Sequence, residues 1–414
     1  MSSRRVGWAS PVASAELPLT AGYEPAQIKA RIQAFEDLGI HRTGWPADDA
    51  TTDWLVAELA VAGIEAESER FAFPRVEVRR AEVRVGTDRI EGVPLHDGGF
   101  TDHGGIDGEI CEDTDDDVFG KIVLATSALR GDPDWTDPAL STRIEELIER
   151  GCFGLILPRG DRDREIVLRN AHTIDSPNAL PSIQIAPRDT GTLQAQIAIG
   201  GEVELELDGE RLRSNATNVI ATIEGTDPNR PPIGIVTPKS GWYTCAAERG
   251  GGIAIFLALA ESLGQASLPR TVHLLASSGH ELNFYGIRAY ARVHREHIAG
   301  ADAWLHLGAS IGAREPRAAT ASSDAGLDEL MRTALAAEEI EPAMRREPGP
   351  SQGGEALIVS ELETRYVSFL GGHAYFHSPS DTVANAVDAE SIASWARASR
   401  EVLSGLLALE GQEG

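Results

Sequence analysis

The chain has 414 residues, of which 42% are hydrophobic, and its formal net charge is −27 at pH 7. This length exceeds what one hydrophobic core usually supports, so two domains are expected. The negative charge opposes binding to a nucleic-acid backbone or an anionic membrane surface, because both carry charge of the same sign. The composition therefore predicts an acidic globular protein without a nucleic-acid or membrane partner.

Cysteine usage and the distribution of apolar residues indicate the compartment. The three cysteines are widely spaced and include no Cys-x-x-Cys pair, which argues against a disulfide framework or a zinc knuckle. The N-terminal segment has no apolar core typical of a signal peptide. The longest apolar run, at 252–260, is too short to span a bilayer. We expect a soluble, cytoplasmic protein.

The first 85 or so residues alternate helical and extended patterns. Apolar residues at helical spacing predict helices over 24–39 and 48–63, and each ends at a glycine. Period-two alternation over 64–73 predicts a strand. From about 90 to 212 the pattern changes to short strand-like runs with one helix. The helix is expected at 143–151 and the strands at 121–126, 154–158, 181–187 and 202–209.

After residue 215 strands and helices alternate again. Apolar strands that alternate with amphipathic helices predict an α/β fold, with a mostly parallel mixed sheet flanked by helices. We expect 1–88 and 214–414 to form this domain and 89–213 to form a β-rich insert over its strand ends. The strands are predicted at 218–224, 232–237, 271–277, 301–308 and 366–371, and the helices at 251–263, 285–298, 325–338 and from about 388.

Ionisable residues gather where these strands end. His280 and Glu281 follow the strand at 271–277, and Lys239 follows the strand at 232–237. His306 and the pair His373 and His377 belong to two further strand ends. Ligand sites of open α/β sheets lie at the carboxyl ends of the strands, so we expect one site there.

Several motifs around these residues resemble metallopeptidase family 28, the co-catalytic zinc aminopeptidases related to glutamate carboxypeptidase II. "LLASSGHELNFYGIRAY" is similar to the glutamate motif of the family and "FHSPSDTV" to its last metal-histidine motif. "FGKIVLAT", "IEELIERGCFGLILPRG" and "LPSIQIAPRDTGTL" resemble the protease-associated domain that many members insert. The resemblance covers nearly the whole chain and implies a zinc-aminopeptidase-like fold.

The metal ligands of the family are mostly replaced. The resemblance implies five ligands and a general-base glutamate, but only Glu281 and His377 match a ligand position. The base position holds His280. Three ligand residues are lost, and the pattern of a two-zinc aminopeptidase is therefore broken. The three lost ligands correspond to Thr237, Ala247 and Gly308. Lys239 stands at the aspartate of the first motif, Glu248 at the second acid and Arg249 at the asparagine.

The replacements bring positive charge into the expected site. Lys239 and Arg249 arrive where metal ligands and their neighbours are lost, and three glycines open the following helix at 250–252. Backbone N–H groups at a helix start favour an anion. The hypothesis that follows is a site for a small molecule that bears a carboxylate.

We interpret His280 as a proton-transfer residue, because an imidazole exchanges protons near neutral pH. Glu281 and His377 are expected to set its orientation and charge. This acid–base chemistry suits a lyase, isomerase, cyclase or hydrolase that acts on an amino-acid-like or peptide-like substrate. No cofactor is expected. The substrate-binding candidates are Lys239, Arg249, His306, Tyr243, His373, Tyr375 and Glu248.

Other interpretations stay open. One is a hydrolase of amide or peptide bonds with a single zinc on Glu281 and His377; it needs a third ligand, because zinc sites use at least three. Another is a catalytically inactive binding module. Lys239 could equally be a surface lysine after a turn, and His306 could simply bond a backbone carbonyl. A homo-oligomer is also open.

Overall fold

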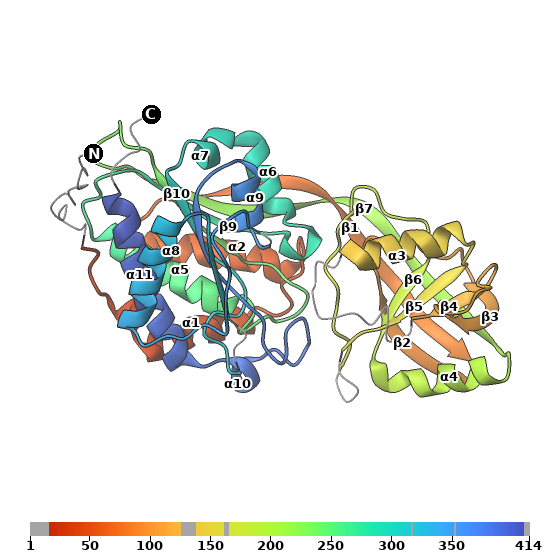
Figure 1. Ribbon diagram of the computed structural model, residues 1–414. Helices are drawn as coiled ribbons and strands as arrows, with labels where there is room; N and C mark the ends of the chain where they lie inside the picture. Colours follow the sequence, from red (N-terminus) through yellow and green to blue (C-terminus); the bar gives the residue numbers. More distant parts are fainter. Residues whose placement is uncertain (1–15, 126–137, 161–164, 316–317, 352, 410–414) are drawn as a thin grey trace, which may run out of the picture.

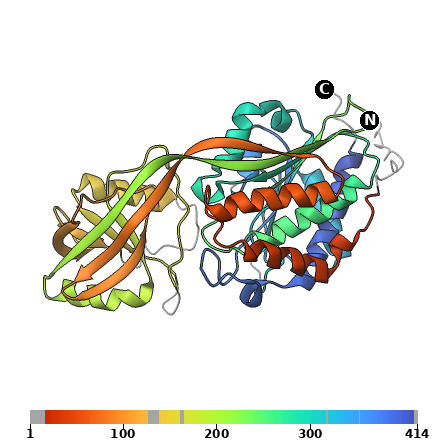
Figure 2. The same cartoon turned by 180° about the vertical axis from the view of Figure 1, so that it is seen from behind.

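The computed structural model describes residues 16–125, 138–160, 165–315, 318–351 and 353–409. It has two lobes joined by a long two-stranded ribbon (Figure 1). The ribbon consists of β1 (Ala66–Val85) and β7 (Glu202–Ile223), which pair antiparallel along almost their whole length. The reverse view shows both strands running from one lobe into the other (Figure 2).

The larger lobe contains a mixed sheet. Its centre consists of four parallel strands, and antiparallel pairings with β7 and β11 flank them. The α/β fold with a mixed sheet and flanking helices is confirmed. The strand order is β7, β9 (Val272–Ser277), β8 (Ile233–Pro238), β10 (Ala303–Leu307), β13 (Tyr366–Leu370), β11 (Ala319–Ser322) and β12 (Met344–Arg345).

Helices cover both faces of this sheet, and the strands show why. Every residue of β8, β9 and β10 is buried, which requires cover on two sides. Neighbouring residues point to opposite faces, so Ile235 and Val236 belong to different core clusters. One face packs against α1 (Pro25–Asp37), α2 (Pro46–Val61), α5 (Gly250–Gly264), α8 (Ala325–Ala337), α10 (Val383–Ala386) and α11 (Ala389–Ala408), and the other against α6 (Tyr285–Val293), α7 (Arg295–Ala299) and α9 (Ala356–Glu361).

In the smaller lobe the strand pairings close into a ring. The order is β1, β2, β6, β5, β4, β3, β7 and again β1, so both ends of the series belong to the ribbon. Apolar side chains fill the ring, and two helices pack on it. The elements are β2 (Asp88–Pro94), β3 (Ile106–Glu112), β4 (Ile122–Leu124), α3 (Pro138–Glu149), β5 (Gly154–Pro158), β6 (Ser182–Ile185) and α4 (Thr190–Ala198).

The ribbon differs from the sequence prediction. The strands expected at 202–209 and 218–224 are one strand, because the polar stretch between them stays paired with β1. A cross-strand ion pair in this stretch, between Arg79 and Glu210, takes the place of the apolar alternation that the prediction relied on. β7 therefore crosses the expected boundary at 213/214 without a break. The division into 1–88 with 214–414 and an insert of 89–213 stays a prediction, as does the likeness of the insert to a protease-associated domain.

A segment of the smaller lobe returns to the strand ends of the larger lobe. Within this segment, which we call the covering segment (165–175), the amide of Leu168 donates to the carbonyl of His377 at 3.2 Å. The amide of Ala171 donates to the carbonyl of Glu281 at 2.8 Å. Leu168 and Ala171 also share an apolar cluster with Trp242 of the larger lobe. The expected site therefore lies beneath chain from the smaller lobe.

Two observations bear on the predicted compartment. In the described ranges, no helix has both the length and the apolar content to cross a lipid bilayer. Residues 1–15, on which the signal-peptide prediction rests, lie outside the described residues.

The predicted strand 121–126 ends at Thr126, which also lies outside the described residues.

Candidate functional site

The predicted site residues lie at the carboxyl ends of the central strands. Lys239 follows β8 directly, and His280 and Glu281 form a single 3-10 turn (His280–Leu282) after β9. Gly279 makes the bend in a left-handed conformation, with φ of 80°. A Cβ there would lie 2.9 Å from the Cβ of Tyr285, so only glycine fits.

His280 is held by a carboxylate that the sequence did not reveal. Its Nδ1 atom lies 3.0 and 3.2 Å from the two carboxylate oxygens of Glu355, the residue immediately before α9. The edge of the ring faces Phe284, with 5.0 Å between ring centroids. The His280 side chain is 9% exposed, whereas that of Glu355 is fully buried. Glu355 thus fixes one nitrogen of a nearly buried ring.

Glu355 also receives two further donors. His306 Nε2 lies 3.2 Å from Oε2 of Glu355, and Ser277 Oγ donates to Oε1 at 3.3 Å. His306 Nδ1 lies 2.8 Å from the hydroxyl of Ser368. His306 therefore bonds two side chains rather than a backbone carbonyl. It acts on His280 only through Glu355, as a buried support.

The protonation states follow from burial and these contacts. Burial lowers the pKa of His280, and the nearby Arg249 lowers it further, although Glu355 opposes both. Burial alone would raise the pKa of Glu355, but His280 and His306 outweigh it and lower this pKa. We therefore assign a neutral His280 whose Nδ1–H donates to an ionised Glu355. Nε2 then carries the lone pair and can accept a proton.

Glu281 faces away from His280. Its Oε1 accepts from both the amide and the hydroxyl of Thr43, each at 2.7 Å, and its Oε2 accepts from Ser240 Oγ at 2.7 Å. Successive side chains of a 3-10 turn diverge by about 120°, which separates the two neighbours. Burial raises the pKa of Glu281. The prediction that Glu281 orients His280 is wrong; Glu355 does so.

His377 belongs to a different pair. Its Nδ1 lies 2.7 Å from the carbonyl oxygen of Leu168, and its Nε2 lies 3.2 Å from Oε1 of Glu248. Arg249 Nη2 lies 2.6 Å from the same oxygen, and Arg249 Nε donates to the carbonyl of Ser240 at 2.7 Å. Burial would raise the pKa of Glu248, but Arg249 and His377 lower it. His377 therefore also does not orient His280.

Lys239 is neither at the surface nor open to a substrate. Its side chain and that of Asp48 in α2 are fully buried and form an ion pair. The ammonium also donates to the carbonyl oxygen of Asp48 at 3.0 Å. The second carboxylate oxygen of Asp48 accepts from Ser278 Oγ at 2.7 Å and from the amide of Gly44 at 2.9 Å. The sequence analysis expects the positive charge of Lys239 to bind a substrate anion. Asp48 instead neutralises this charge inside the protein.

A protein carboxylate also occupies the start of the glycine-rich helix. Asp381 accepts from the amide of Ala247 at 2.8 Å and from that of Glu248 at 3.0 Å, just before α5. His373 Nε2 lies 3.3 Å from Asp381, and its Nδ1 lies 2.9 Å from Ser310 Oγ. Asp381 therefore binds the turn that precedes the helix start expected at 250–252, and His373 supports it.

The two tyrosine candidates lie at the margin of the site. Tyr243 is half-buried, and its hydroxyl donates to the carbonyl of Ile166 in the covering segment at 3.2 Å. Burial raises its pKa to about 12, so it stays protonated at neutral pH. Tyr375 is half-buried against the core.

A small cavity lies beside Glu281. Its volume is about 20 Å³, enough for a single water molecule. Arg42 lines it together with Thr43 and Trp242, and the Arg42 guanidinium lies 5.9 Å from the ring centroid of Trp242. Arg42 and Arg75 both line this cavity beside Glu281, and the sequence analysis named neither.

The residues of the strand ends do not fit a two-zinc centre. Within the described residues, no three histidine, cysteine, aspartate or glutamate side chains are grouped so that they could hold a metal ion. Lys239 and Arg249 offer only N–H donors in place of ligands. A Cβ at Gly308 would lie 2.7 Å from His306 Cε1, which leaves no space for an aspartate. The absence of a cofactor itself stays a prediction.

Comparison with known proteins gives the fold but no sequence relative. No protein-family model and no curated protein matches the sequence. A zinc aminopeptidase from Bacillus subtilis superposes with a TM-score of 0.75 at 15% identity, covering 94% of this chain and 95% of that one. A peptidase M28 precursor from Shewanella amazonensis SB2B gives 0.72 at 19% identity over 93% and 96%. An aminopeptidase from Aneurinibacillus sp. strain AM-1 gives 0.69 at 15% identity over 93% and 94%.

These likenesses extend over both lobes of the chain, since the coverage exceeds nine-tenths on each side. At such low identity they establish the architecture and leave the chemistry to the residues described above. The chain has the fold of the peptidase M28 zinc aminopeptidases.

Proposed function

We propose that the protein is an enzyme that uses His280 as its general acid and base, with Glu355 as the residue that positions it. The observation that carries this proposal is the contact of His280 Nδ1 with both carboxylate oxygens of the fully buried Glu355, at 3.0 and 3.2 Å. A carboxylate that holds Nδ1–H leaves Nε2 as the proton acceptor and stabilises the imidazolium once it forms. The same ring can return the proton in a later step.

The substrate is proposed to be a small amino-acid-like or peptide-like molecule with a carboxylate group. Lys239 and Arg249 are already paired with Asp48 and Glu248, so neither supports recognition of an anion. Arg42 supports it better, because its guanidinium lines the cavity next to Glu281 and lies near three aromatic rings. The cavity has room for one water molecule, so a substrate carboxylate would have to displace that water and widen the cavity to meet this planar donor.

The proposed chemistry needs no metal and covers elimination, isomerisation, cyclisation or hydrolysis, each of which moves a proton to or from a reacting atom. We therefore screen the purified protein against dipeptides, aminoacyl amides and N-acyl amino acids, with mass spectrometry to detect products. The screen is run with and without a chelator. Turnover in chelator that disappears in His280→Gln protein supports the proposal. His103→Gln is the matched control, because His103 is an exposed histidine of the smaller lobe.

A second candidate is an amide or peptide hydrolase with one zinc ion, and the shared fold with zinc aminopeptidases favours it. Its ligands would include Glu281 and His377, which would first have to leave Thr43, Ser240 and Glu248. Activity that a chelator abolishes and zinc restores would replace the first proposal with this one. No product from any substrate class, with ligand binding retained, would instead support a binding module.

A further inference from the structure

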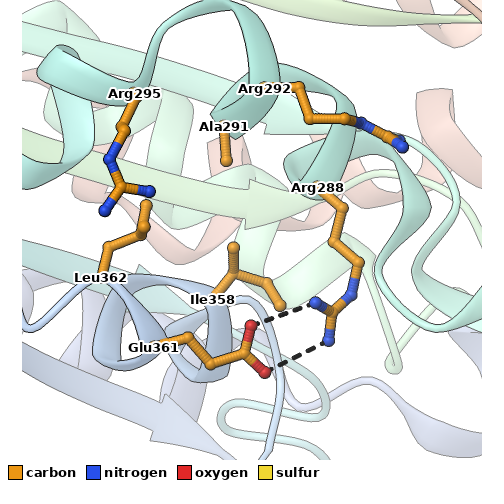
Figure 3. A pocket seen from close by; sticks show the side chains of 7 residues that line it. All are labelled: Arg288, Ala291, Arg292, Arg295, Ile358, Glu361 and Leu362. Atoms are coloured by element: carbon orange, nitrogen blue, oxygen red, sulfur yellow. Dashed lines mark hydrogen bonds and ion pairs between the residues drawn. The ribbon is translucent and has the colours of Figure 1, made fainter.

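A groove of about 460 Å³ lies on the larger lobe between α6–α7 and α9 (Figure 3). Its volume falls within the range of small-molecule sites. It is distinct from the strand-end site, since none of its lining residues belongs to that site. The lining residues are Arg288, Ala291, Arg292, Arg295, Ile358, Glu361 and Leu362.

The groove is positively charged although the chain carries a net charge of −27. Arg288 is satisfied, because its two terminal nitrogens lie 3.0 and 3.4 Å from the carboxylate oxygens of Glu361. Arg292 lies over the ring of Tyr285, 5.6 Å from its centroid. The side chain of Arg295 has no hydrogen-bond or ion-pair partner among the residues that the structure describes. One guanidinium is therefore left to meet an external anion.

Apolar side chains form the space between the guanidinium groups. In the close-up view Leu362 lies next to Arg295, and the buried Ile358 lies between Leu362 and Arg288 (Figure 3). A carboxylate can accept two parallel hydrogen bonds from Arg295, and an apolar group attached to it would cover the partly buried Ala291 and Leu362. A hydrated inorganic anion would leave this apolar surface wet. The geometry thus matches an organic carboxylate with an apolar body.

The two walls of the groove lead directly to the proposed catalytic pair. α6 begins at Tyr285, shortly after the turn that carries His280, and α9 begins at Ala356, immediately after Glu355. α7 follows α6 after a single residue, so a ligand that bridges α7 and α9 would load both elements that continue from His280 and Glu355. The Arg288–Glu361 ion pair already connects the same two walls.

We propose that this groove is a second ligand site, which binds a small organic carboxylate with an apolar group and transmits its occupancy to His280. The binding itself does not depend on the proposed function. Only the coupling to His280 involves a residue of the proposed function. It is tested by the NMR signals of the His280 ring and not by turnover.

Benzoate is the probe, and benzamide is its uncharged counterpart. Binding is measured by calorimetry on the full chain, with Arg295→Gln as the test variant and Arg332→Gln as the matched control. Arg332 is an exposed arginine of α8 paired with Glu329. We expect saturable binding of benzoate, little binding of benzamide, and affinity lowered at least about tenfold in Arg295→Gln alone, since a charge-assisted bond is lost.

A second measurement follows the ring signals of His280 by NMR, assigned through His280→Gln. These signals should shift when benzoate binds to the native chain and stay fixed in Arg295→Gln. Absence of saturable benzoate binding, or equal affinity in Arg295→Gln, would overturn the site. Binding that leaves the His280 signals unchanged would overturn the coupling.

Discussion

Lys239 and Asp48 form a fully buried ion pair that connects the end of β8 to α2. Neither charge is exposed, and Ser278 and Gly44 complete the hydrogen bonds of the carboxylate. The ammonium of Lys239 therefore neutralises the carboxylate of Asp48 inside the protein.

Lys239→Met should destabilise the protein, because it leaves the Asp48 carboxylate buried without a counter-charge. A loss of about 3–5 kcal/mol in the free energy of unfolding is expected. Lys239→Met combined with Asp48→Asn should recover part of this loss. Urea denaturation measures both, with Lys121→Met as a control at the surface, where Lys121 pairs with Glu109. If Lys239→Met instead changes only the KM of a substrate, the lysine binds that substrate.

His280→Gln should lower kcat by roughly 10²–10⁴, the usual range for loss of a general acid or base. Glu355→Gln should also lower kcat, because the amide cannot stabilise the imidazolium, and it should change the pH dependence of kcat. Circular dichroism should show both variants folded. Turnover equal to that of the native chain in His280→Gln would remove this residue from the mechanism.

Lowering the pH should destabilise the protein already at pH values well above the pKa of ordinary carboxylates. Burial lowers the pKa of His41 to about 3, that of His96 to about 3 and that of His273 to about 4. The unfolded chain binds these protons near pH 6.5, whereas the folded chain does not, so stability falls as the pH drops from about 6.5 towards 4.

The expected loss between pH 7 and pH 5 exceeds about 2 kcal/mol, since each histidine contributes up to about 1.4 kcal/mol per pH unit below 6.5. Urea denaturation at several pH values measures it. His41→Gln should reduce the slope, because His41 is fully buried between Phe35 and Thr51. His103→Gln should not. A slope of the native chain near zero over this interval contradicts the prediction.

The purified protein should contain well under two equivalents of zinc. Cationic or non-ligating side chains stand at the would-be ligand positions, including Lys239, Ala247 and Gly308. Inductively coupled plasma mass spectrometry on protein prepared without chelator or added metal measures the zinc content per chain. Two bound ions about 3.5 Å apart would contradict this assignment. One ion on Glu281 and His377 would favour the single-zinc hydrolase.

The sequence predicted the fold better than the site, for a physical reason. Strands such as β8 and β9 are apolar throughout, and their burial does not depend on distant partners. Side-chain pairing does depend on them: His280 and Glu355 are 75 residues apart, and Lys239 and Asp48 are 191 apart. Adjacency in sequence suggested Glu281 as the partner of His280, but the 3-10 turn separates the two side chains.

Some signals in the sequence could have found the missing residues. Glu355 stands between Gly354 and the apolar run of α9, and a lone carboxylate there has no solvent-facing neighbours at helical spacing. Gly354 has φ of 65°, and a Cβ at this glycine would lie 2.3 Å from His306 Cε1. Asp48 offered no such signal, since an aspartate in the first turn of a helix is typical of the surface.

The continuity of β1 and β7 makes the smaller lobe an extension of the tip of a hairpin. Arg84 and Glu204 are paired across the ribbon, so a two-residue turn after them would close it as an ordinary hairpin. The whole of the intervening chain thus replaces the tip of a hairpin, without any change of register in the larger sheet. What the exchange adds to the strand ends is the carbonyl of Leu168, which fixes Nδ1 of His377 as a donor.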